Sequence, residues 1–443
     1  MIERRGGDYF SDARSFPLIM INLSSAKTKT MKVKPLLALT LFSLILQSCT
    51  LVYRGIHYGD ADIDDSKVFV NYELSKSSNP FSFKQADSTL FDRIIASSKD
   101  TLVKRLKDTL TKTTTRAFLV IRNDTILFEH YYRGYKRSDI STFFSVSKSV
   151  TSLLVGIAVD EGYISSIDDP VTKYVKELNS ADPKFQKLTI RDLLSMRSGL
   201  KFDENYSNPF KGMARLYYGT NQLGQIRRMK FECDPGTKHE YQSVSTALMG
   251  IVLEKATGMT LAHYFKEKVW SPLRMENSAS WSLDDRRHRS TKAYCGLNAT
   301  AIDLAKIGRL YLNHGRFDGR QIVSESWVQK TFTPDTANSG YQFQWYSITD
   351  FVIDSLGHIM FFPDSLSALS FKHSKLSNSY SLFSKSNRSG RWYIERFTNQ
   401  FFACGIMQQF LFIDPSKNLI IVRLGDNGDI DYLPLMCHLA NVL

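Results

Sequence analysis

Ser145 and Lys148 are the two residues of this chain whose types and spacing most clearly permit chemistry. Side chains at positions i and i+3 lie on the same face of a helix, so the Lys148 amine can reach the Ser145 hydroxyl. Burial lowers the pKa of a lysine, and a desolvated Lys148 could accept the proton that Ser145 loses when it attacks a carbonyl carbon. The backbone N–H of Ser145, at the start of the helix, could bind the oxyanion that forms.

The S-x-x-K spacing alone is weak evidence, because it occurs at residues 24–27, 145–148 and 198–201. Only the second copy opens a long stretch with apolar residues at helical spacing, which Gly162 ends. The apolar positions are Val150, Leu153, Leu154 and Ile157. We therefore expect Ser145 where a sheet is followed by a core helix. The alternative is that Ser145 only caps the helix and Lys148 is solvated.

Several segments occur in the order found in one enzyme superfamily. They include FFSVSKSVTSLLVGIAVDEGYI, LTIRDLLSMRSGLKFDENY, PGTKHEYQSVSTALMGIVLEKATG and FFACGIMQQFLFIDPSKNLIIVRLG. Together they resemble the serine beta-lactamase and penicillin-recognising hydrolase superfamily, and within it the class C-like branch that includes 6-aminohexanoate-dimer hydrolases and esterases. The resemblance covers about residues 115–430.

The resemblance implies an α+β fold of the beta-lactamase/transpeptidase type, in which an antiparallel sheet is flanked by helices from both chain ends. A helical lobe is inserted after the nucleophile helix, and we expect it over about residues 168–297. One serine hydrolase domain would then occupy residues 115–443, after a tether and leading segment over 49–114. The Ser-, Asn- and Lys-rich stretch 373–392 predicts a surface loop.

The resemblance also implies a tyrosine that relays protons between serine, lysine and leaving group. The family places it in Y-x-N or Y-x-S, and Tyr241-Gln242-Ser243 is the matching segment. Ser243 replaces the more usual asparagine, a change found in esterase and amide-hydrolase members, which makes an efficient beta-lactamase less expected. Residues 206–208 also fit the pattern. The alternative is a tyrosine buried beside a helix start with its hydroxyl bonded to backbone.

The third family element is a strand that faces the nucleophile, and Gly405-Ile406-Met407-Gln408-Gln409 matches it. The segment lacks the K-T-G or H-x-G of many relatives, and Gln408 stands where glycine is expected. We predict that the backbone N–H near Ile406 is the second oxyanion donor. Met407 predicts a pocket wall with little charge. The alternative is that this segment is only half of a hairpin.

Further substrate contacts are predicted for Ser243, Gly405 and Met407, and for the aromatic residues Tyr217 and Trp345. The two aromatic residues are candidates for the cleft between lobe and sheet. Aromatic residues at such positions are also common in the core.

Residues 31–48 form a second strong pattern, with two lysines, an apolar stretch and Leu46-Gln47-Ser48 before Cys49. This pattern resembles a bacterial lipoprotein signal, which predicts cleavage before Cys49 and lipidation of that cysteine. We therefore expect a protein of the bacterial cell envelope, outside the cytoplasm, held at the membrane by its lipid. The alternatives are an ordinary signal peptide or an uncleaved anchor. Residues 1–48 would be a dispensable leader.

Charge and composition exclude some classes of function. The chain has 57 Lys and Arg against 44 Asp and Glu, but the basic residues are scattered and no nucleic-acid-binding motif accompanies them. The nine histidines show no metal-ligand spacing, so we expect neither metal nor organic cofactor. Cys233, Cys295, Cys404 and Cys437 are widely spaced, and their disulfide status is open.

The predicted function is hydrolysis of a small or peptide-like ester or amide through an acyl-enzyme on Ser145, with Lys148 as base and Tyr241 as proton shuttle. One alternative is a cell-wall D-Ala peptidase or beta-lactamase. Another is a catalytically silent lipoprotein that binds peptidoglycan or a partner with the same fold. The sequence does not specify the substrate, the preference between esters and amides, or the oligomeric state.

Overall fold

The computed structural model describes residues 50–206, 211–338, 340–356, 358–376, 381–386 and 389–443. The predicted signal peptide and Cys49 lie outside these ranges. None of the helices in the described ranges is long and apolar enough to cross a membrane.

The central feature is a nine-stranded sheet with the strand order β10-β13-β14-β15-β3-β4-β2, to which β11 and β12 add along β13. All pairings are antiparallel except that of β2 with β4. The strands are β2 Lys84–Gln85, β3 Thr115–Arg122, β4 Thr125–Tyr131, β10 Tyr346–Phe351, β11 Phe361–Phe362, β12 Ser381–Lys385, β13 Trp392–Gly405, β14 Gln409–Asp414 and β15 Leu419–Gly425. The predicted α+β fold is confirmed.

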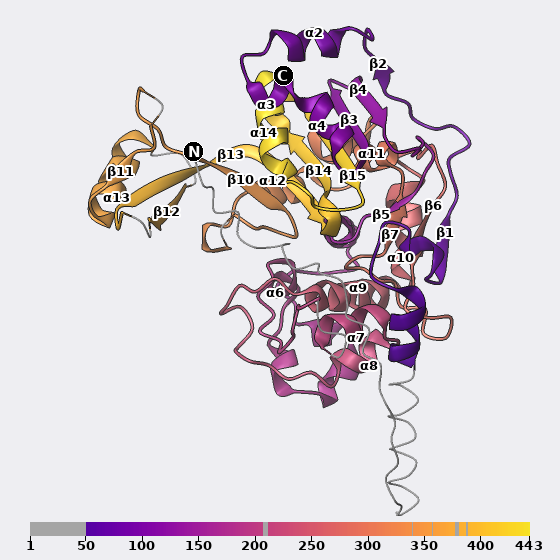
Figure 1. The fold of residues 1–443 in the computed structure, drawn as a ribbon. Helices are drawn as coiled ribbons and strands as arrows, with labels where there is room; N and C mark the ends of the chain where they lie inside the picture. The colour runs from indigo at the N-terminus through magenta and orange to yellow at the C-terminus, as the bar shows by residue number, and fades with distance from the viewer. Residues whose placement is uncertain (1–49, 207–210, 339, 357, 377–380, 387–388) are drawn as a thin grey trace, which may run out of the picture.

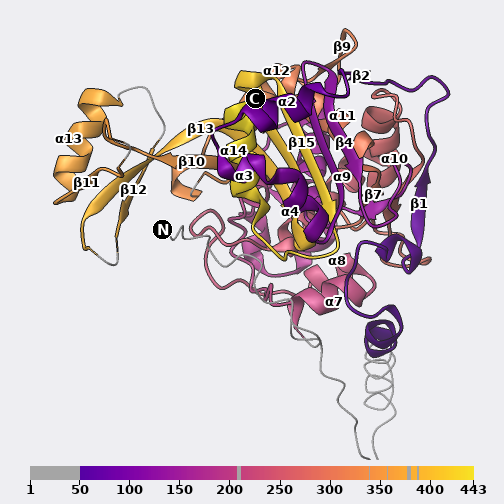
Figure 2. The same ribbon diagram turned by 45° about the horizontal axis from the view of Figure 1, so that its top comes forward.

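Helices cover both faces of this sheet, as Figure 2 shows for its central strands. Alternate residues of β3 point to opposite sides, so Phe118 and Val120 enter one apolar cluster and Leu119 and Ile121 the other. The first cluster holds α2 Leu90–Ser97, α3 Thr101–Lys104, α4 Leu106–Lys112 and α14 Tyr432–Val442. The second holds α5 Val146–Asp160, α11 Ala301–Leu312 and α12 Glu325–Phe332.

Much of the stretch predicted as a tether and leading segment, residues 49–114, packs against the rest of the domain. Its helices α2 to α4 supply Phe91, Leu106 and Leu110 to the core, each at most 1% exposed. Upstream, β1 Asn71–Leu74 pairs with β6 Ala279–Ser282. Apolar residues at helical spacing in 90–112 account for this, since they can be buried only against the sheet.

The inserted lobe contains α6 Ile190–Leu194, α7 Gly212–Tyr218, α8 Gln222–Ile226 and α9 Ser243–Thr257, which gather on one side of the main sheet (Figure 1). After α10 Leu261–Phe265, the chain enters a small sheet with the order β1-β6-β7-β5, where β5 is Ser141–Thr142 and β7 is Leu297–Ala299. Part of the range predicted as lobe therefore belongs to this sheet. A hairpin of β8 Arg316–Phe317 and β9 Arg320–Gln321 follows α11.

The stretch predicted as a surface loop belongs to an arm that projects from the body (Figure 1). The arm consists of β10, β11, α13 Ser365–Lys375, β12 and the first half of β13. A small cluster of Phe362, Ala368 and Ile394 packs inside it. The polar composition of residues 373–392 hides the strand β12, because only a few side chains of this thin arm need to be apolar.

Candidate active site

The turn before α5 places Ser145 at the boundary between the small sheet and the core helix. Strand β5 ends at Thr142, and Phe144 adopts a left-handed conformation with φ of 48°. The N–H groups of Val146, Ser147 and Lys148 donate to carbonyls three residues earlier. The Ser145 N–H lies just ahead of this ladder, where helix geometry leaves donors without intrahelical acceptors. Ser145 is 8% exposed, so the nucleophile candidate is buried.

Lys148 lies directly against Ser145. Its Nζ is 2.8 Å from Ser145 Oγ and 2.9 Å from the backbone oxygen of Tyr294, and both partners are neutral. The residue is 2% exposed. Burial lowers the pKa of Lys148 to about 8, although the nearby Glu204 carboxylate opposes the shift. A substantial fraction of Lys148 is therefore neutral near physiological pH and able to accept a proton.

Tyr241 lies two residues before the first residue of α9, and its ring is close to Lys148. The Lys148 Nζ is 5.1 Å from the centre of the Tyr241 ring. Burial and the charge of Glu204 raise the pKa of Tyr241 well above its ordinary value, and a hydrogen bond with Ser145 only partly opposes this. Burial is the largest cause of this shift, and it favours the neutral form of Tyr241 in the resting protein. Tyr241 is thus a neutral phenol that can donate a proton.

Glu204 is a candidate site residue that the sequence analysis did not single out. Its carboxylate accepts hydrogen bonds from the Ser243 N–H at 2.8 Å, the Ser243 hydroxyl at 2.5 Å and the Tyr206 hydroxyl at 2.9 Å. Burial raises its pKa, and the positive charge of Lys148 counteracts this. Ser243 is fully buried and bound to Glu204, so the structure does not place it on an open substrate surface. The sequence signal that could have pointed to Glu204 is its place in FDENY, within one of the segments that resemble the family.

The end of strand β13 approaches Ser145 from the sheet side. A Cβ on Gly405 would lie 2.4 Å from the Phe143 carbonyl oxygen and 3.1 Å from the Ser145 nitrogen, so only glycine fits. The turn Ile406–Gln408 follows and is half-buried. Ile406 therefore lies one residue beyond the contact with Ser145. Its N–H is placed close to the N-terminus of α5.

The fold agrees with the comparisons. The sequence matches the Beta-lactamase family over residues 103–425. The chain belongs to this family. A 6-aminohexanoate-dimer hydrolase of Paenarthrobacter ureafaciens is 28% identical over 278 residues, which are 56% of this chain and 68% of that protein.

Two further relatives of the beta-lactamase family are informative. The teichoic acid D-alanine hydrolase of Staphylococcus aureus (strain MRSA252) is 23% identical over 222 residues, and the match spans 48% of this chain but only 52% of that protein. A solved structure from Bacillus anthracis, provisionally assigned as a 6-aminohexanoate-dimer hydrolase, has a TM-score of 0.59 at 22% identity and covers 85% of this chain and 90% of that one. The relatives indicate a hydrolase of the beta-lactamase fold.

Tyr217 and Trp345, predicted to line the cleft, lie in the core of the beta-lactamase domain. Trp345 is 1% exposed, and its ring centre is 4.7 Å from that of Tyr311. Tyr217 is 6% exposed and donates its hydroxyl hydrogen to Asp65 of the leading segment. Large aromatic side chains bury much apolar area, so packing in the core accounts for both residues.

Other aromatic residues lie beside the catalytic candidates instead. The rings of Tyr241 and Tyr341 are 6.1 Å apart in an edge-on arrangement, and Tyr341 is 4.8 Å from Tyr346. Tyr346 is half-buried, whereas Tyr341 is 3% exposed. Tyr346 at the start of β10 therefore replaces its neighbour Trp345 as the candidate wall residue. The alternation of strand residues between the two faces explains a shift of one position.

The cysteines near this site are poor nucleophiles. Burial raises the pKa of Cys404 to about 12 and that of Cys295 to about 11, so both remain thiols. Within the described ranges, Cys233 and Cys437 are not joined by a disulfide.

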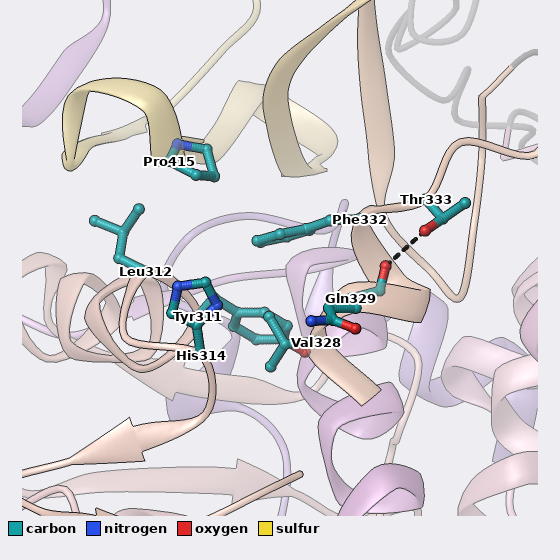
Figure 3. Close-up of a pocket in the computed structure, with 8 residues that line it drawn as sticks. All are labelled: Tyr311, Leu312, His314, Val328, Gln329, Phe332, Thr333 and Pro415. Atoms are coloured by element: carbon teal, nitrogen blue, oxygen red, sulfur yellow. Dashed lines mark hydrogen bonds between the residues drawn. The ribbon is translucent and has the colours of Figure 1, made fainter. Parts of the chain in front are cut away.

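Two features lie outside the catalytic group. A surface crevice of about 370 Å³ is lined by residues of α11, α12 and the β14–β15 turn, and none of the catalytic candidates contributes to it (Figure 3). Asp284, Asp285 and His288 have side-chain atoms within 4.8 Å of one another. The Asp284 carboxylate already accepts the N–H groups of Asp285, Ser290 and Asn221 within its own region. These bonds give Asp284 a structural role.

We expect Gly405→Ala to lower the rate at which a fluorophosphonate labels Ser145 by about 100-fold, because the added Cβ must displace either the turn or the Ser145 backbone. The measurement is intact mass against time. Gly55→Ala is the matched control, since a Cβ there meets no atom within 4 Å. Labelling of Gly405→Ala at the wild-type rate would show that the close approach is not needed.

Proposed function

We propose that this protein is a serine hydrolase that cleaves an ester or amide bond through an acyl-enzyme on Ser145. The observation that carries the proposal is the 2.8 Å contact between the Ser145 hydroxyl and a buried Lys148 whose pKa is lowered to about 8. A lysine that only supported the structure would gain from a carboxylate partner. The two hydrogen-bond acceptors of Lys148 are uncharged, which favours a role as base.

The proposed cycle needs only groups of the chain and a water. Neutral Lys148 takes the proton of Ser145 as the oxygen attacks the carbonyl carbon, and the N–H groups of Ser145 and Ile406 bind the oxyanion. The intermediate collapses, and Tyr241 gives its proton to the leaving oxygen or nitrogen while Lys148 returns one to Tyr241. Water then attacks the acyl group, and the same residues transfer its protons in the reverse direction.

The substrate that we propose is a small or peptide-like ester or amide. The wall formed by Ile406 and Met407 contains no cation, so recognition of a carboxylate beside the scissile bond is not provided there. This distinguishes the chain from relatives with a lysine or histidine on this strand. The named activities of the aminohexanoate-dimer and D-alanine hydrolases are consistent with an amide or ester substrate.

We expect Ser145→Ala to abolish fluorophosphonate labelling and to reduce hydrolysis of a p-nitrophenyl ester by at least about 10³-fold, because the covalent step is lost. Unchanged thermal melting would serve as the control for folding. If the folded wild-type protein shows neither labelling nor turnover, it would instead be a silent binding protein. Efficient hydrolysis of nitrocefin would favour the beta-lactamase alternative.

The pH dependence of kcat/KM should report Lys148. The base must be neutral, so the rate should rise as the pH increases through the lowered pKa, near 8. The Glu204 carboxylate favours the charged form of Lys148, and Glu204→Gln should therefore move the rise to lower pH. Asp203→Asn is the matched control, because Asp203 pairs with Lys211 rather than with Lys148. An identical profile for wild type and Glu204→Gln would contradict this assignment.

We also propose that the protein is exported and lipid-anchored through Cys49 in the bacterial cell envelope. The support is the pattern of residues 31–49, in which a basic start and an apolar stretch precede a small residue and cysteine. Cells supplied with radiolabelled palmitate should incorporate label into the wild-type protein but not into Cys49→Ala. Equal labelling of the two would rule out this anchor. Cys437→Ala controls for loss of a cysteine elsewhere.

A further inference from the structure

The turn that carries Ile406 has an unfavourable backbone conformation. Met407 has φ of 61° and Gln408 has φ of 56°, so two consecutive residues with side chains are left-handed. Residues other than glycine adopt this region with difficulty, and a pair of them requires support from the surrounding structure. The sequence of the turn itself does not provide that support, since neither position is glycine or asparagine.

Arg423, on the neighbouring part of the sheet in β15, supplies the contacts. Its Nη1 donates to the carbonyl oxygens of Met407 at 2.5 Å and Gln408 at 3.0 Å, and its Nη2 donates to that of Asn427 at 3.2 Å. The guanidinium carbon lies 3.9 Å from the centre of the Tyr432 ring. Arg423 is fully buried, and all these partners are uncharged. Burying a cation among uncharged partners costs free energy, and an apolar residue at this position would avoid that cost. Stability alone therefore does not explain an arginine here.

These contacts bear directly on the proposed oxyanion site. The two carbonyl groups that Arg423 binds belong to the second and third peptide units after the unit that contains the Ile406 N–H. On the other side of that unit, Gly405 packs against Phe143 and the Ser145 nitrogen. The backbone is thus held by contacts on both sides of the Ile406 N–H. Without Arg423, the turn could relax and rotate this N–H away from the substrate.

We propose that Arg423 is a positioning residue for the oxyanion site: it holds the Met407 and Gln408 carbonyl groups so that the Ile406 N–H points at the carbonyl oxygen of the substrate. This inference rests on the proposed function, because it assigns a role in the same acyl-transfer step. Arg423 does not touch the substrate and acts only through the turn.

Two glutamine side chains hold the same turn against its neighbours. Gln408 donates to the Ile430 carbonyl oxygen at 2.6 Å and accepts from the Tyr432 N–H at 3.0 Å, at the start of α14. Gln409 exchanges two hydrogen bonds with the backbone of Gly425. These bonds anchor the ends of the turn, whereas Arg423 binds its left-handed peptide units. Loss of Arg423 should therefore distort the turn without detaching it.

The test compares Arg423→Met and Arg423→Lys with the wild-type protein. We expect Arg423→Met to lower kcat for a p-nitrophenyl ester by about 10- to 100-fold with KM changed less than about threefold, because an oxyanion donor acts mainly in the transition state. The inhibition constant of phenylboronic acid, whose adduct with Ser145 carries an anionic oxygen, should rise by a similar factor. Arg423→Lys should lie in between, since an ammonium group lacks the planar fork.

Lys306→Met is the matched control. Lys306 is another fully buried cation, pairs with Asp303 at 3.0 Å and donates to the Arg274 carbonyl oxygen at 3.2 Å, but lies on α11. The Lys306→Met variant should have a lower melting temperature, with kcat and the inhibition constant of phenylboronic acid unchanged. Wild-type kcat in folded Arg423→Met would overturn the proposal, as would equal kinetic losses in Arg423→Met and Lys306→Met.

Two further measurements keep the test decisive. If Arg423→Met does not fold, Arg423→Lys becomes the test, because it keeps the charge but lacks the planar fork, and wild-type kcat in that folded variant would overturn the proposal. If the wild-type protein forms no adduct, the proposed function fails, and a crystal structure of Arg423→Met still tests the turn. Left-handed conformations retained at residues 407 and 408 would then overturn the positioning role.

Discussion

The burial of Lys148 against Ser145 is the constraint on which the rest of the architecture depends. Burial is the cause of the lowered pKa of Lys148, so the helix that carries it must be well covered. Thirteen of the fifteen residues of α5 are buried, which a helix lying on the surface of a sheet could not achieve. The lobe helices and small sheet complete the enclosure that the main sheet and α11 begin. The two-part domain is therefore a requirement of the chemistry proposed for Lys148.

Three separate parts of the chain meet at this lysine, and each is held by contacts of its own. The turn before α5 fixes Ser145, while Glu204 links the segment between α6 and α7 to the first residue of α9. The end of β13 reaches the same place because Gly405 allows backbone to touch backbone. Since no one contact spans all three parts, their relative positions depend on the packing of the whole domain. Packing of the whole domain can also hold Phe144, Met407 and Gln408 in their unfavourable left-handed conformations.

Much of the fold and part of the site could be predicted from the sequence, for physical reasons. Ser145 and Lys148 are linked by helix geometry, which is local, and the structure places them 2.8 Å apart. The antiparallel sheet followed from family segments in a fixed order. Glu204 and Arg423 were not predicted, because their importance arises from contacts with residues distant in sequence. Trp345 is buried in the core, because side-chain type alone cannot tell a core position from one beside a cleft, and the half-buried Tyr346 is now the candidate.

The contacts of Glu204 and Arg423 have one effect in common: they bind or orient oxygen atoms around the site. An oxyanion would be destabilised by any carbonyl or carboxylate oxygen that faced it. The Met407 and Gln408 carbonyl oxygens are turned toward Arg423, and the Glu204 carboxylate is bound by Tyr206 and by the N-terminal end of α9, where the helix dipole favours negative charge. These three acceptors are thus bound by donors from the protein. In the proposed mechanism, the N–H groups at the start of α5 and after Gly405 are the donors to the substrate.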